Sequence, residues 1–167
     1  MPDFSAVRSQ LEALAGPDQA VDIAVLKACG ARVYRRPEQM AVARMPGARF
    51  DMVVPNLTGS ITAARELIAQ VLPDFWVTSG LCALTGHASI GPDYNGPAGA
   101  RLRAEWPESD FHFGFHADLA PGDGAHRECA ALLTCLLTAL ERRPAPALVA
   151  APGGIEPPRL PGASPAP

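Results

Sequence analysis

Two histidines, His112 and His116, stand four residues apart in the run Phe-His-Phe-Gly-Phe-His. On a helix this spacing could place both rings on one metal ion, but the strict alternation predicts a strand over residues 111–116. Phe111, Phe113 and Phe115 would then face the core, and the histidines would face away from it. The histidines would lie ~13 Å apart, at ~3.3 Å per residue. Because zinc ligands lie ~2.0–2.1 Å from the ion, no metal site is predicted.

Arg101 and Arg103 alternate with apolar residues in segment 100–106, which predicts a second strand with one solvated face. If the two strands pair as a hairpin across residues 107–110, the arginines and histidines share one face. Such a face suits a small anionic ligand or a partner protein, and an ordinary solvated sheet face is the alternative. The candidate binding site comprises Arg101, Arg103, His112, His116 and Tyr94. No catalytic residue and no cofactor is assigned.

A thiol offers the enzymatic alternative. Cys82, with His87 or His116 and with Asp118, has the side-chain types of nucleophilic catalysis. The sequence after Cys82 lacks the second glycine of a nucleophile elbow, and a core cysteine is the competing interpretation. No C-x-x-C pair is present, so we predict no zinc ribbon and expect four reduced thiols: Cys29, Cys82, Cys129 and Cys135.

Segment 32–49 carries five arginines and is the candidate for nucleic-acid binding. Residues 31–56 admit two interpretations, a solvated arginine-rich loop or an edge strand near residues 39–45. The whole chain has a net charge of −3 and a pI of 5.8, which argues against a dedicated nucleic-acid binder. The arginines are Arg32, Arg35, Arg36, Arg44 and Arg49.

Apolar residues at helical spacing predict helices over residues 3–14, 17–30 and 61–71, the last with Ser60 as N-cap. A helix over about 125–142 is apolar around almost its whole circumference, which is typical of a buried helix. Residues 75–83 predict a strand, which continues or restarts at 87–90. The sequence thus predicts an α+β fold, in which a mainly antiparallel sheet of three to five strands packs against the helices.

The chain divides by composition near Pro144. Residues 1–143 predict a single domain, whereas eight of the 18 prolines fall in residues 144–167 and predict a disordered tail. Residues 1–10 lack the apolar core of a signal peptide, and no apolar run approaches the ~20 residues of a membrane span. We therefore expect a cytoplasmic protein without membrane association.

Three segments together resemble a family of small uncharacterised proteins of tailed phages and prophages, related to the phage ABA-sandwich domain. They are the Gly-Pro-Asp opening and helix of 16–30, the run Thr-Gly-Ser-Ile-Thr-Ala-Ala of 58–64, and the apolar helix of 129–140. The likeness covers residues 12–31 and 50–141; Leu57 and Thr62 replace the usual Tyr and Asp. The resemblance implies helices covering a layered sheet and a non-enzymatic accessory protein of the host-cell cytoplasm. Such a protein would bind a partner or an anionic ligand, as an oligomer.

Overall fold

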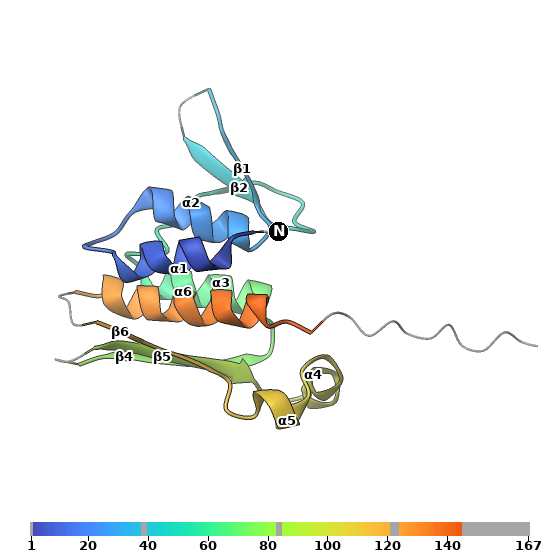
Figure 1. Cartoon of the computed structure of the whole chain (residues 1–167). Helices are drawn as coiled ribbons and strands as arrows, with labels where there is room; N and C mark the ends of the chain where they lie inside the picture. The colour runs from blue at the N-terminus through green and yellow to red at the C-terminus, as the bar shows by residue number, and fades with distance from the viewer. Residues whose placement is uncertain (1, 38–39, 83–84, 121–123, 145–167) are drawn as a thin grey trace, which may run out of the picture.

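Helix α6 (His126–Glu141) lies at the centre of the computed structural model, which describes residues 2–37, 40–82, 85–120 and 124–144 (Figure 1). Eleven of its residues are buried, including Leu132, Leu133, Leu136 and Leu137 with no exposed surface. The predicted buried C-terminal helix is therefore confirmed. The helix begins after the positive-φ residue Gly124 and runs to Arg142 as its C-cap.

One face of α6 covers an antiparallel sheet of three strands, ordered β4-β5-β6. The strands are β4 (Phe75–Leu81), β5 (Gly86–Pro92) and β6 (Phe115–Leu119). Helix and sheet approach closely at Gly86, where an added Cβ would lie 2.7 Å from the backbone carbonyl of Arg127. A side chain at position 86 would push the first turn of α6 away from the sheet.

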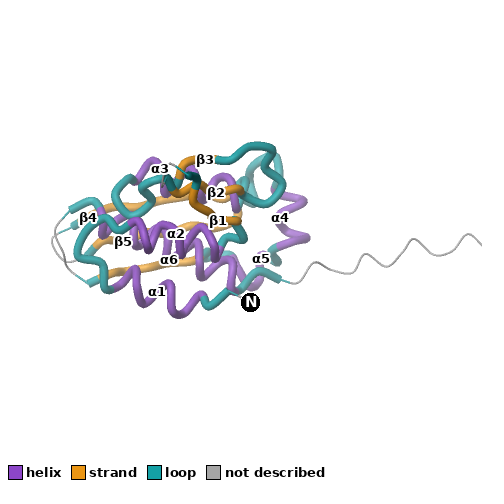
Figure 2. The backbone as a smooth tube through the Cα atoms, turned by 90° about the horizontal axis from the view of Figure 1, so that it is seen from above, coloured by secondary structure: helices purple, strands orange, loops and turns teal. Residues whose placement is uncertain are grey.

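Three other helices form the middle of the molecule together with α6 (Figures 1 and 2). Helix α3 (Ile61–Val71) lies beside α6, and α1 (Phe4–Glu12) and α2 (Gln19–Ala28) pack on the side away from β4-β5-β6. The predicted cap is present, since Ser60 Oγ accepts a hydrogen bond from Ala63 N at 3.2 Å. Seen from above, α1 and α3 lie at opposite edges of the helical layer (Figure 2).

A second antiparallel sheet, ordered β1-β2-β3, lies beyond α2. Its strands are β1 (Arg32–Arg35), β2 (Ala41–Arg44) and β3 (Met52–Val53). The α+β class is confirmed, but two sheets of three strands replace the single sheet expected. The loop interpretation of 31–56 is wrong, and the segment expected as an edge strand contains β2, the central strand. Of the predicted tail, only Pro144 lies within the described residues.

The strand predicted over 100–106 is a helix, α4 (Gly99–Glu105). Leu102 and Trp106, four residues apart, are both buried on its inner side, and Arg101 pairs with Glu105 across one turn at 3.0 Å. The alternating pattern was ambiguous, because residues four apart share a face in a helix as well as in a strand.

The strand predicted over 111–116 is also wrong. Helix α5 (Glu108–Phe111) occupies its beginning, and Gly114, at φ +68°, turns the chain into β6. The three phenylalanines do not share a face, since Phe115 is 3 % and Phe113 79 % exposed. Phe111 and Phe115 pack edge-on against Trp106, with ring centroids 5.1 and 5.9 Å away. Alternation begins only at Phe115, where Ala117 and Leu119 are also buried.

Segments 16–30 and 58–64 are joined by hydrogen bonds. Asp22 and Thr58 are buried, and Thr58 N donates to Asp22 Oδ1 at 2.8 Å. Asp18 N in turn donates to Thr58 Oγ1 at 2.8 Å. Burial raises the pKa of Asp22, and the hydrogen bonds from Thr58 oppose that rise only in part. These residues join the start of α2 to the approach of α3, which is a structural role.

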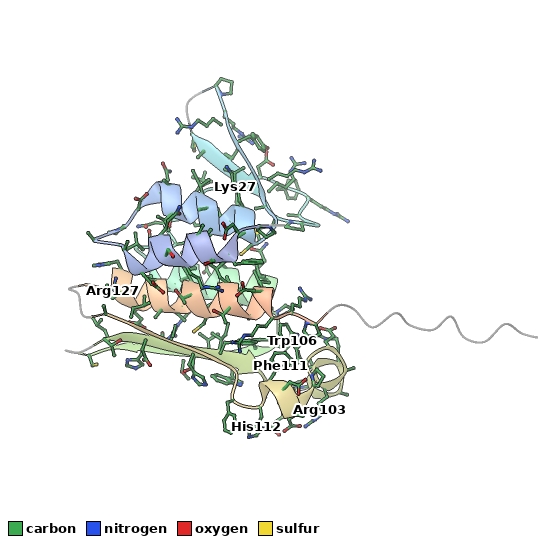
Figure 3. The ribbon with its side chains drawn as sticks, viewed as in Figure 1. Lys27, Arg103, Trp106, Phe111, His112 and Arg127 are labelled. Carbon is green, nitrogen blue, oxygen red and sulfur yellow. The ribbon has the colours of Figure 1, made fainter. Side chains whose placement is uncertain are left out.

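Arg127 is a buried cation that joins three parts of the fold and is only 4 % exposed. Its guanidinium donates to the carbonyl of Ala120 from Nε and Nη2, at 3.1 and 2.7 Å. Nη1 donates to the carbonyls of Glu12 and Leu14 at 3.2 and 3.4 Å. Figure 3 shows Arg127 at the start of α6. The positive charge thus lies at the carbonyl end of α1, where the helix dipole favours a cation.

Candidate functional site

Three of the five predicted site residues meet near α4 and α5. The guanidinium of Arg103 lies over the ring of Tyr94, 5.7 Å from its centroid. Glu108 lies between Arg103 and His112, with Oε2 3.2 Å from Arg103 Nε and Oε1 3.6 Å from His112 Nδ1. Figure 3 labels Arg103 and His112 beside α4 and α5. A hydrogen bond fixes Tyr94, because its hydroxyl donates to the carbonyl of Trp106 at 3.0 Å.

The other two predicted residues lie elsewhere, so the expected five-residue face does not form. Arg101 binds Asp74 at 2.8 Å and Glu105 at 3.0 Å. His116 lies on the face of β4-β5-β6 turned away from α6, with Nδ1 2.7 Å from Ser89 Oγ. Because carboxylates already pair with both arginines, this region is a poor site for an anion.

Three of the four thiols offer little reactivity. Burial raises the pKa of Cys29 and Cys135 to about 12 and that of Cys129 to about 11, so all three stay protonated at neutral pH. Cys82 is exposed just beyond β4, two residues after Gly80, which pairs with His87 in the sheet. In the part of the chain that the structure describes, no hydrogen bond joins Cys82 to a histidine. The same part holds no group of three His, Cys, Asp or Glu side chains placed for a metal.

The sheet β1-β2-β3 carries the more open cationic surface. Arg32 pairs with Arg44 across the strands, Tyr34 pairs with Val42, and Val42 pairs with Val53. Side chains alternate along a strand, which defines an outward "arginine face" comprising Arg32, Tyr34, Arg36, Arg44 and Val53. Residues 31–56 contain five arginines and two acidic residues in a chain of net charge −3.

A single carboxylate organises this face. Asp51 accepts hydrogen bonds from the hydroxyl of Tyr34, from Arg44 Nε at 2.7 Å and from Arg36 Nη2 at 3.1 Å. The bonds from Tyr34 and Arg44 lower the pKa of Asp51 to about 2, so it is ionised at neutral pH. The bond to Asp51 also raises the pKa of Tyr34.

Apolar side chains are exposed beside these charges. Of the six large hydrophobic residues exposed within the described ranges, four lie on this sheet or its loops. Phe50 is the most exposed at 82 %, and the other three are Tyr34, Met40 and Val53. The sequence shows the arginines and allows an edge strand near residues 39–45, but it did not predict the three-stranded sheet, whose buried face Ala41, Ala43 and Met45 supply.

No family model, curated protein or solved structure matches the chain. The fold and the site define its class directly, as an α+β protein with two antiparallel sheets and an arginine-bearing surface. None of the described helices combines the length and the apolarity that crossing a membrane requires.

Proposed function

We propose that this protein is a non-enzymatic binding protein that docks an acidic partner protein on the arginine face. One observation carries the proposal: four large hydrophobic side chains are exposed on one small sheet and its loops, which also bear Arg32, Arg36 and Arg44. They are Tyr34, Met40, Phe50 and Val53. Tyr, Phe, Met and Arg are the residues enriched at protein interfaces. The positive charge favours an acidic partner, because complementary charges speed encounter and set specificity.

The phage or prophage origin is part of the same proposal. Its support is the sequence resemblance over residues 12–31 and 50–141, and the neighbouring genes would test it. Association of this chain with itself also belongs to the proposal, and sedimentation velocity measures it.

Nucleic acid is the competing ligand for the same arginines. The acidic balance of the whole chain and the exposed apolar side chains favour a protein partner. A nucleic-acid complex would show a steep loss of affinity with salt and would not survive nuclease.

The test is capture from an extract of the cells that encode the protein, followed by titration with the purified partner. Phe50→Ser should lower the affinity about tenfold, as truncation of a central interface aromatic does. Phe113→Ser is the matched control, since Phe113 is a similarly exposed phenylalanine between α5 and β6, on the opposite side of α6 from β1 and β2 (Figure 1). Equal loss in the control, or loss of binding after nuclease treatment, would contradict the proposal.

A further inference from the structure

A cavity of about 360 Å³ opens at one end of the arginine face. Arg32 and Arg44 contribute charge to it, and Gly30, Met45, Pro46, Gly47 and Ala48 form the rest of its lining. Gly30 and Gly47 have positive φ angles of 85° and 76°, which glycine adopts without strain. An added Cβ at Gly47 would meet no atom within 4 Å, so the cavity is open beside it.

The two arginines in the cavity are direct neighbours. They form a cross-strand pair in β1 and β2, an arrangement that is unfavourable for like charges. Asp51 binds Arg44 through Nε, and no acceptor among the described residues is hydrogen-bonded to the two terminal Nη groups of that guanidinium. Among the described residues, no carboxylate lies within 4.0 Å of the Arg32 guanidinium. An anion between the two side chains would remove their repulsion.

We infer that this cavity binds a phosphate monoester group, held by Arg32 and Arg44 and backed by the apolar wall of Met45, Pro46 and Ala48. This inference rests on the proposed function and names the chemistry that its arginine face recognises. A phosphate presents three acceptor oxygens and can accept from two guanidinium forks, whereas a carboxylate has two oxygens and suits one fork. Asp51 is a positioning residue, because it fixes the orientation of Arg44 without touching the ligand.

The phosphate group can belong to a phosphorylated side chain of the partner or to a free small molecule. Titrations with inorganic phosphate, O-phosphoserine and a phosphoserine peptide, followed through the Nε–H resonances of the arginines, separate these sources. A peptide that binds more tightly than inorganic phosphate assigns the group to a partner, and the reverse order assigns it to a free metabolite. Glutamate is the carboxylate control.

Arg32→Gln and Arg44→Gln should each weaken phosphoserine binding about tenfold, the loss of one charge-assisted contact. Arg32→Lys should also weaken it, because the charge remains but the fork is lost. Arg35→Gln is the matched control, since Arg35 lies on the same strand but alternates to the opposite face. Its affinity should stay within about twofold of the wild type, and the melting temperature of each variant confirms that it is folded.

Three results would overturn the inference. They are saturable binding of glutamate as tight as that of phosphoserine, an equal loss in Arg35→Gln, and no saturable shift with any phosphate. If the captured partner still binds after phosphatase treatment and only Phe50→Ser weakens it, the pocket assignment fails while the proposed function stands. If phosphoserine binds at Arg32 and Arg44 but no partner docks on the face, the proposed function fails instead.

Discussion

Replacing Arg127 by Met should destabilise the protein more than any exposed arginine substitution. Methionine keeps an unbranched apolar stem of similar reach but loses four donated hydrogen bonds to three carbonyls. At the net ~1 kcal/mol typical of one bond, the loss is ~4 kcal/mol. Hydrogen bonds from a charged donor are stronger, which increases this figure, whereas removing a buried positive charge removes its desolvation cost, which decreases it. We therefore expect a loss of ~3–5 kcal/mol.

Urea unfolding at neutral pH measures this free energy, and Arg101→Met is the control. Arg101 is exposed and paired with Asp74 and Glu105, so its loss should cost at most ~1 kcal/mol. Native-state hydrogen exchange adds a local measure, because α1 should lose protection before α6 in Arg127→Met. A loss below ~1 kcal/mol, or unchanged protection of α1, would show that Arg127 does not hold α1 to α6.

Three further predictions follow from buried and paired side chains. Phe115→Ala should lower the free energy of unfolding in urea by ~3–5 kcal/mol, and Phe113→Ala by at most ~0.5 kcal/mol. The reverse order would contradict the burial of Phe115 and the exposure of Phe113. Asp22→Ala should cost ~1–3 kcal/mol by leaving Thr58 N without its acceptor, whereas Asp22→Asn keeps that acceptor. Because the pKa of Asp22 is raised, its contribution to the free energy of unfolding is largest below pH 3.8 and becomes smaller as the pH rises. Asp22→Asn should therefore gain stability relative to the wild type with rising pH. A difference between the two proteins that stays constant with pH would contradict this. The lowered pKa of Asp51 stabilises the fold above pH 3.8, and this stability is lost as the pH falls to about 2. In Asp51→Asn the free energy of unfolding should therefore depend less on pH in that range. An unchanged pH dependence would show that the ion pairs contribute nothing.

The sequence predicted the long elements because their periodicity is unambiguous. Helices α1, α2, α3 and α6 and strand β4 follow from apolar spacing and from caps such as Ser60. The predictions for the short elements after Pro92 were wrong, because a few alternating residues fit a helix and a strand equally well. Packing around Trp106 and the left-handed turn at Gly114 decide between them, and neither can be read from local pattern.

The candidate site was harder to predict than the fold. Tyr94, Arg103 and His112 do come together, but through Glu108 and two short helices rather than through a hairpin. Neutralisation by acidic neighbours depends on three-dimensional placement, so the sequence could not show which arginines remain open. In segment 32–49 the decisive fact is the register that sets Arg32 opposite Arg44, which composition does not contain.

The contact between α1 and α6, the first and last of the described helices, also affects how the chain folds during synthesis. Leu11 of α1 has no exposed surface, and Arg8 of α1 pairs with Glu141 of α6 at 2.6 Å. More than 110 residues separate the end of α1 from the start of α6. At ~5–20 residues per second the ribosome needs roughly 6–23 s to make that interval, during which the apolar stripe of α1 has no α6 to cover it. The core around α6 can therefore close only after α6 has left the ribosome, late in synthesis.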